Sequence, residues 1–130
     1  PLFEPILWFQ KPYILGGTIT DNILEYGVGA WNEKALKKDT LFEDNTGLSN
    51  ILRVEYNKND TGLHETQKPL KLIEILIELV TLEGQVILDP FVGSGTVCVA
   101  AKKLNRQYLG IEINPEYVRI ANERLDKIKK

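Results

Sequence analysis

One stretch of the chain decides its fold: Val86-Ile87-Leu88-Asp89-Pro90-Phe91-Val92-Gly93-Ser94-Gly95-Thr96. The apolar run at 86–88 predicts a central strand of a parallel sheet. The two glycines after it predict a turn whose backbone can come close to a ligand. Residues 97–104 predict a helix, so the stretch indicates a strand, a glycine-rich turn and a helix in succession.

The same alternation continues on both sides of this stretch. Residues 69–82 predict a helix that is apolar on most sides and ends by Gly84. Residues 108–111 predict a second strand, and Asn114 and Pro115 are typical of the cap and first residue of a terminal helix. The order predicts an α/β fold with a parallel sheet, helices on both faces and a ligand crevice at the carboxyl ends of the strands.

The first 62 residues are less regular. Residues 6–9 form a continuous apolar run that predicts a buried strand. Thr20 and Asp21 predict the cap of a short helix that reaches residue 26 and is ended by glycine. Residues 52–56 alternate apolar and charged side chains, as a half-exposed strand does, and residues 57–62 predict a loop.

Composition excludes several classes of protein. The chain has 130 residues, of which 43% are hydrophobic and 26% charged, as in a single globular domain rather than a disordered or collagen-like chain. Its net charge of −2 does not indicate a general polyanion binder. One cysteine and one histidine are too few for a structural zinc site or a disulfide scaffold. No apolar stretch predicts a signal peptide or a membrane span.

Methionine is absent from the sequence, even at position 1. We therefore expect the chain to be a piece of a longer protein.

Two carboxylates are placed where the predicted strands end. Asp89 stands at the tip of the first strand, where it suits a ligand ammonium group and would repel a pyrophosphate. Glu112 follows the second strand, 19 residues after Gly93, where an acidic residue can accept from both ribose hydroxyls. Cys98 replaces the third glycine of a dinucleotide fingerprint, and Val97 stands where a P-loop has lysine. These residues favour a nucleoside with an amino-acid end over a dinucleotide.

Three segments resemble the DNA amino-methyltransferases, which act on adenine N6 or cytosine N4. Residues 89–96 resemble their S-adenosylmethionine loop. Residues 64–69, His-Glu-Thr-Gln-Lys-Pro, match a second cofactor segment that is usually His-Pro-Thr-Gln-Lys-Pro, with Glu65 in place of proline. Residues 3–11 resemble the strand after the family's catalytic half. This order implies the beta class, in which the catalytic half comes first, and the strong match covers residues 64–125.

The resemblance implies S-adenosylmethionine as cofactor and gives a set of expected binding residues: His64, Thr66, Lys68, Asp89, Phe91, Gly93, Ser94, Gly95, Thr96, Glu112 and Asn114. Asp89 and the 93–96 turn would hold the methionine part, with Phe91 packing beside the cofactor. Glu112 would bind the ribose hydroxyls, and Asn114 would face the adenine. Thr66 and Lys68 would reach the cofactor carboxylate.

The resemblance also implies an organisation and a setting. We expect residues 1–13 to continue from a missing catalytic half, 14–62 to be a variable, loop-rich, target-recognition-like region, and 63–130 to form the S-adenosylmethionine-binding region. The implied fold is the Rossmann-like methyltransferase fold, incomplete in this chain. The implied parent is a cytoplasmic restriction-modification enzyme of a bacterium, archaeon or phage. It would methylate double-stranded DNA, with adenine favoured, and use neither a metal nor a membrane.

The family's catalytic segment, Asp/Asn/Ser-Pro-Pro followed by an aromatic residue, is absent, because none of the six prolines are adjacent. We therefore expect this chain to be inactive alone, and exposed apolar surface to favour self-association. One alternative is a non-catalytic remnant or binding module that keeps the cofactor pocket. Another is a nucleotide-dependent Rossmann oxidoreductase, against which Cys98 and Asp89 argue.

The singled-out residues also have plain structural interpretations. His64 could be a capping histidine, Lys68 a solvated lysine and Glu112 a charge that favours the next helix dipole. Cys98 is expected to be a small buried residue. The aromatic residues at 8 and 9 are expected in the core, whereas Trp31 indicates either a loop anchor or a nucleic-acid contact.

Overall fold

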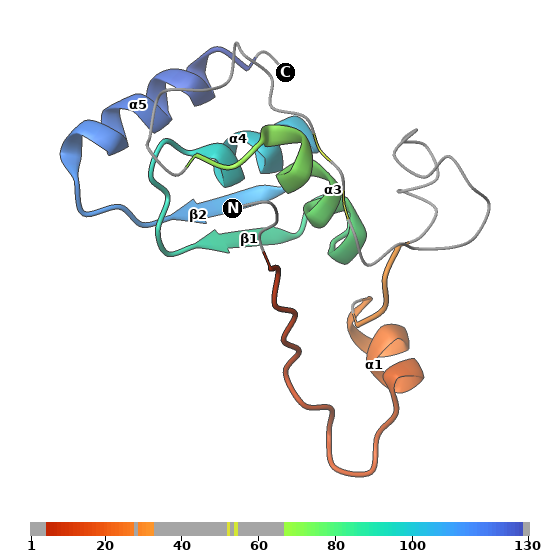
Figure 1. Ribbon diagram of the computed structural model, residues 1–130. Helices are drawn as coiled ribbons and strands as arrows, with labels where there is room; N and C mark the ends of the chain where they lie inside the picture. The colour runs from red at the N-terminus through yellow and green to blue at the C-terminus, as the bar shows by residue number, and fades with distance from the viewer. Residues whose placement is uncertain (1–4, 28, 33–51, 53, 55–66, 129–130) are drawn as a thin grey trace. The chain divides into compact units, whose positions relative to one another are not determined.

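A computed structural model describes residues 5–27, 29–32, 52, 54 and 67–128 (Figure 1). The chain divides into two compact units, Pro1–Ala30 and Trp31–Lys130. The expected boundary between residues 62 and 63, the loop at 57–62, and both His64 and Thr66 lie outside the described residues.

The first unit contains helix α1, Ile19–Tyr26. Its N-terminus is a capping box: Thr18 Oγ1 accepts from the Asp21 N–H at 3.2 Å, and Asp21 Oδ2 accepts from the Thr18 N–H at 2.8 Å. Gly27 ends the helix in the left-handed conformation, with φ 67°. The predicted helix is confirmed, but its cap is Thr18 and not Thr20, because only Thr18 lies three residues before an acidic side chain that can return the hydrogen bond.

The predicted buried strand at residues 6–9 is wrong. These residues are not assigned to a strand, and the side chains of Trp8 and Phe9 are 46% and 85% exposed rather than in a core. An apolar run becomes a strand only where another strand offers backbone partners. The described part of the first unit contains no strand, so the run has nothing to pair with there.

The second unit is built on two parallel strands, β1 (Val86–Asp89) and β2 (Gln107–Gly110). Their register pairs Val86 with Gln107 and Asp89 with Gly110. The ladder continues past the strand ends, because the Ile111 N–H donates to the Asp89 carbonyl at 2.9 Å. Both predicted strands are therefore confirmed, and their carboxyl ends lie side by side.

Three helices pack with this sheet: α3 (Leu70–Val80), α4 (Thr96–Lys103) and α5 (Pro115–Asp126). Helix α4 connects β1 to β2 and contacts both strands, and α3 and α5 pack against α4. In Figure 1 the three helices lie on one side of the sheet. Ala100 and Ala101 are fully buried beneath Ile77, so the small side chains of α4 let α3 come close.

The helix ends follow the sequence signals to different degrees. Asn114 caps α5, since its Oδ1 accepts from the Glu116 N–H at 2.9 Å, and Pro115 is the first helical residue, as predicted. Helix α3 ends at Val80, before Gly84, which instead forms the turn into β1 with φ 81°. None of the helices in the described part of the chain is long and apolar enough to cross a membrane.

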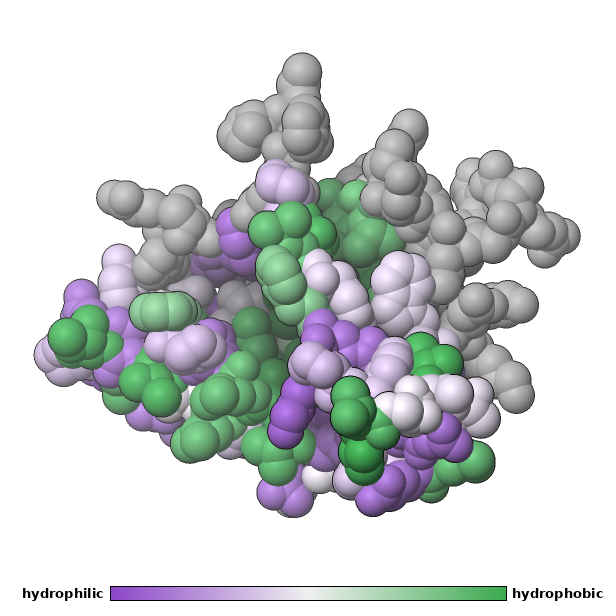
Figure 2. Space-filling model, turned by 90° about the horizontal axis from the view of Figure 1, so that it is seen from below, coloured by the Kyte–Doolittle hydropathy of each residue, from purple (hydrophilic) through white to green (hydrophobic). Residues whose placement is uncertain are grey.

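The face of the sheet away from α4 carries exposed apolar side chains. Val86, Leu88 and Leu109 are 62%, 61% and 58% exposed, and Ile111 beyond β2 is also exposed. Figure 2, coloured by residue hydropathy, shows hydrophobic residues at the surface. The predicted parallel α/β fold is confirmed. Helices were expected on both faces of the sheet, but within the described residues of the second unit they cover only one face.

The half-buried Leu52 and Val54 pack against the buried Ile75 and Leu79 of α3. Neither is assigned to a strand, and their neighbours in the sequence lie outside the described residues. The alternation read at residues 52–56 therefore marks an apolar contact with α3 at these two positions.

Gly95 and Gly84 allow a matched test of the packing between the loop and α5. Both have a positive φ, but a Cβ at Gly95 would lie 2.7 Å from Ala121 Cβ, whereas one at Gly84 would meet open space. We expect Gly84→Ala to lower the free energy of unfolding by about 1 kcal/mol through backbone strain. Gly95→Ala should lower it by about 3 kcal/mol, because overpacking adds to the same strain. Urea denaturation measures both losses, and equal losses would contradict the close contact with Ala121.

Candidate nucleotide-type cofactor site

The carboxylate of Glu112 joins the end of β2 to the glycine-rich loop after β1. Its Oε2 accepts from the Gly93 N–H at 2.8 Å, and its Oε1 accepts from the Asn114 N–H at 2.9 Å. Hydrogen bonds to an ionised acceptor are stronger than neutral ones. One side chain therefore holds the loop and the start of α5 at fixed positions beside the strand ends.

Asp89 occupies the last position of β1 and is half-buried. Its Oδ1 accepts from the Phe91 N–H at 3.1 Å, which turns the chain away from the strand direction. A carboxylate has about four lone-pair directions, so this bond leaves Asp89 able to accept from a ligand. Phe91 itself is exposed.

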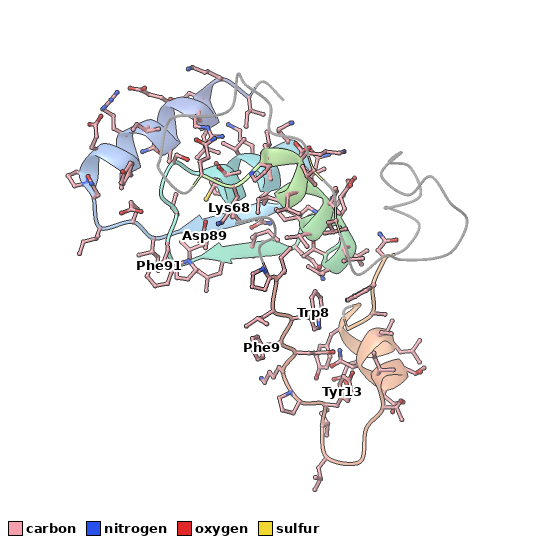
Figure 3. All side chains as sticks on the ribbon, viewed as in Figure 1. Trp8, Phe9, Tyr13, Lys68, Asp89 and Phe91 are labelled. Carbon is pink, nitrogen blue, oxygen red and sulfur yellow. The ribbon has the colours of Figure 1, made fainter. Side chains whose placement is uncertain are left out.

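The loop and the strand ends border an open cavity of about 330 Å³. The residues that line it come from the segment before α3, from α3, from the end of β1, from the loop, from the first turn of α4 and from the segment after β2: Gln67, Lys68, Ile73, Asp89, Phe91, Val92, Gly93, Ser94, Thr96, Val97 and Glu112. Figure 3 shows Lys68, Asp89 and Phe91 gathered beside the carboxyl end of β1. The cavity lies where parallel α/β folds bind their ligands.

Seven of the residues predicted from the sequence line this cavity: Lys68, Asp89, Phe91, Gly93, Ser94, Thr96 and Glu112. Gly95 and Asn114 are described but are not among the lining residues. Gly95 shapes the loop, and Asn114 caps α5 and donates to Glu112. His64 and Thr66 fall outside the described residues.

The lining combines one ammonium group, from Lys68, with the carboxylates of Asp89 and Glu112. This donor and acceptor set suits a ligand that carries both an amino acid and hydroxyl groups. Backbone N–H groups of the first turn of α4 add donors, because Gly95 provides no side-chain cap. No group of three His, Cys, Asp or Glu side chains among the described residues could hold a metal ion.

Sequence reasoning missed Arg124 of α5, whose guanidinium reaches the loop. Its Nη1 lies 2.6 Å from the Ser94 carbonyl oxygen and 3.1 Å from Thr96 Oγ1. Gln67, Ile73, Val92 and Val97 were also not predicted as lining residues. A signal for Arg124 was present, because it shares a helix face with the apolar residues that α5 buries.

Cys98 lies in α4 below the loop and is 3% exposed, as expected of a small buried residue. Burial raises the pKa of its thiol, and the negative charge of Asp89 raises that pKa further. The close packing extends to β2, since a Cβ at Gly110 would lie 2.5 Å from Val92 Cγ2 and 3.0 Å from Cys98 Sγ. Gly110 is therefore required by the approach of the loop and α4.

The chain is similar to known DNA methyltransferases. A family model described as DNA methylase, of the N6/N4 type, matches residues 1–123. The chain is 52% identical over 125 residues to the Type II methyltransferase M.HindIII of Haemophilus influenzae, and the match covers 96% of this chain and 40% of the relative. It is 44% identical over 124 residues to M.BglI of Bacillus subtilis, with 95% of this chain and 31% of the relative covered. The chain thus spans 31–40% of the length of these relatives.

Among solved structures, the chain is similar to the PvuII DNA methyltransferase, whose title calls it cytosine-N4-specific. The TM-score is 0.62, and the match covers 77% of this chain and 38% of that chain. At 20% sequence identity this likeness shows the fold alone. The Rossmann-like architecture predicted from the sequence is therefore confirmed.

Glu112 is expected to contribute measurably to stability. Glu112→Ala leaves the Gly93 and Asn114 N–H groups without their acceptor, and should lower the free energy of unfolding by about 2 kcal/mol. Glu112→Gln keeps one acceptor oxygen and should lose about 1 kcal/mol. Urea denaturation measures both. Glu83→Gln, in the exposed turn before β1, is the control and should leave stability unchanged; equal behaviour of all three variants would disprove the link between β2 and the loop.

The raised pKa of Cys98 predicts a protected thiol and a pH-dependent stability. The folded pKa lies above the unfolded one, so the associated stability is complete below the unfolded pKa and is lost as pH rises through the folded pKa. At pH 8.5, iodoacetamide should modify the folded chain at least about tenfold more slowly than the urea-unfolded chain. Because Cys98 is the only cysteine, mass spectrometry reads the rate directly. Cys98→Ala should weaken the loss of stability at alkaline pH, and equal modification rates would contradict the burial.

Proposed function

The chain belongs to the N6/N4 DNA methylase family, and we propose that its cavity binds S-adenosylmethionine and that the longer protein it represents methylates amino groups in DNA. The observation that carries the proposal is the lining of the cavity, which brings Lys68, Asp89 and Glu112 together at the carboxyl ends of β1 and β2. The full activity is proposed for the longer protein, since this chain spans only part of its relatives.

The chemistry of the cavity fits S-adenosylmethionine. This molecule has an ammonium group, a carboxylate, a ribose diol and an adenine. The carboxylate of Asp89 complements its ammonium group, the ammonium group of Lys68 complements its carboxylate, and the carboxylate of Glu112 complements the ribose diol. The volume of about 330 Å³ lies at the lower end of the range for small-molecule sites. A dinucleotide would bring a pyrophosphate close to Asp89, which argues against a nicotinamide-dependent oxidoreductase.

Each residue then has an assigned task. Asp89 accepts from the ligand ammonium group, and Lys68 donates to the ligand carboxylate. Glu112 accepts from the ribose hydroxyls, sharing a carboxylate that already holds Gly93 and Asn114. Phe91, which is exposed at the cavity, covers the ligand from water. For His64, Thr66 and Asn114 the assignment to the cofactor rests on the sequence resemblance.

S-adenosylmethionine, when bound, supplies a methyl group attached to a positively charged sulfur. The acceptor would be the amino nitrogen of a flipped-out base: the nitrogen–methyl bond would form as the sulfur–methyl bond breaks, the sulfur would leave as a neutral thioether, and the nitrogen would release one proton to solvent. The chain's own residues bind and orient, which is how a transfer without a covalent enzyme intermediate is accelerated. We take adenine N6 as the first target to test and cytosine N4 as the second.

A second candidate is a non-catalytic module that keeps the cofactor pocket. It is favoured by the absence of an Asp/Asn/Ser-Pro-Pro-aromatic segment from residues 1–130. The two candidates agree that this chain binds S-adenosylmethionine and transfers no methyl group alone. They differ in the longer coding sequence, where the enzyme requires a Pro-Pro segment and the module does not.

Two partners belong to the proposal. The longer protein would bind double-stranded DNA, as its family implies. This chain alone would self-associate, because Val86, Leu88 and Leu109 expose apolar surface on one face of the sheet.

Calorimetric titration tests the cofactor assignment. We expect the chain to bind S-adenosylmethionine and not NAD. Asp89→Asn and Lys68→Met should each weaken binding by about tenfold or more, because each removes one charge-assisted contact. Lys71→Met is a matched control, since Lys71 is exposed on α3 and is not among the cavity-lining residues.

Binding of NAD alone would overturn the proposal. Binding of S-adenosylmethionine with no loss in either variant would keep the ligand and refute the roles of Asp89 and Lys68. If the chain binds neither ligand, the titration is repeated on the full-length protein, where a second failure would overturn the cofactor assignment.

A further inference from the structure

Helix α5 reaches back to the glycine-rich loop through one side chain. Arg124 Nη1 lies 2.6 Å from the Ser94 carbonyl oxygen, 3.2 Å from Ser94 Oγ and 3.1 Å from Thr96 Oγ1. Arg124 follows Ser94 by 30 positions in the sequence, so the contact is tertiary and not part of a local turn. A single guanidinium nitrogen therefore lies within hydrogen-bond distance of three acceptor atoms of the loop.

These acceptors are buried. Ser94 is 3% exposed and Thr96 is 6% exposed, and they are the two polar residues in the buried set of the described chain. A buried carbonyl or hydroxyl that loses its donor carries the full cost of desolvation, since water cannot replace the bond. The loop conformation seen here is therefore tied to the presence of a donor at Arg124.

The loop is held from two sides. Glu112 accepts from the Gly93 N–H on the strand side, and Arg124 donates to Ser94 and Thr96 on the helix side. Gly95, between these residues, packs against Ala121, which is one turn before Arg124 on α5. Helix α5 thus determines both the space and the hydrogen bonds of the loop on the side away from the ligand.

We propose that Arg124 is a positioning residue for cofactor binding: it sets the conformation of residues 93–96 by holding Ser94 and Thr96, and it does not contact the cofactor. The proposal rests on the proposed function, because the effect on affinity presumes that S-adenosylmethionine binds at this loop. Arg124 is not among the residues that line the cavity, whereas Ser94 and Thr96 are. Ser94 and Thr96 therefore both line the cavity and accept from Arg124.

Arg119 provides a matched control on the same helix. It is exposed and pairs with Glu116 and Glu123 of α5, so it has the same residue type and the same element but no contact with the loop. Arg124→Met and Arg119→Met remove the same charge and keep a similar apolar stem. Arg124→Lys keeps the charge and supplies a single donor in place of the planar fork.

Two measurements on the full chain test the proposal. Titration with S-adenosylmethionine should give an affinity lower by about tenfold or more in Arg124→Met, by less in Arg124→Lys, and unchanged in Arg119→Met. Amide hydrogen exchange in the ligand-free chain should show faster exchange at Gly93 and Gly95 in Arg124→Met, with the core amides of α4 unchanged. A role confined to overall stability would instead speed exchange throughout the unit.

The outcomes separate the proposal from the function it builds on. If neither the unchanged chain nor the full-length protein binds S-adenosylmethionine, the cofactor assignment fails, and the role of Arg124 in binding it fails with it. If the unchanged chain binds and Arg124→Met binds equally well, the positioning role is refuted while the cofactor assignment stands. Should Arg124→Met fail to fold, Arg124→Lys decides, because unchanged affinity together with unchanged loop exchange would refute the proposal.

Discussion

The parallel pairing of β1 with β2 is the constraint on which the candidate site depends. The register brings Asp89 beside Gly110, and two residues later Glu112 accepts from the Gly93 N–H. A loop and a strand that are 19 positions apart in the sequence are joined there by one carboxylate. The cavity, the start of α4 and the start of α5 are all placed relative to this contact.

Local signals explain which elements the sequence predicts well. Asn114 and Pro115 determine the start of α5 through bonds and angles within a few residues, and the structure has both as expected. The apolar run at 86–88 became a strand because a partner lies in the same unit. The run at 6–9 is also apolar throughout, but its state depends on a partner strand that no local pattern supplies.

The residues of the candidate site also fall into those that a local sequence pattern predicts and those that depend on a distant partner. The loop and Glu112 could be found from their spacing, because a strand, a glycine turn and a following acidic residue form a linear pattern. Arg124 could not be assigned a partner from the sequence, since Ser94 lies 30 positions away. Arg124 does lie on the face of α5 that buries Ala121 and Leu125. A charged residue on a buried face is expected to have a partner, but the sequence does not identify that partner.

The side chains of β1 have a consequence for how the sheet is aligned. Val86, Ile87 and Leu88 are all apolar, so a slip of one residue between the strands would exchange the two faces without moving a polar group inward. Hydrophobic alternation therefore does not select the register. Gly110 does, because only a residue without a side chain fits beneath Val92 and Cys98. The register of the two strands is thus determined by the absence of a Cβ at Gly110 rather than by an attractive contact.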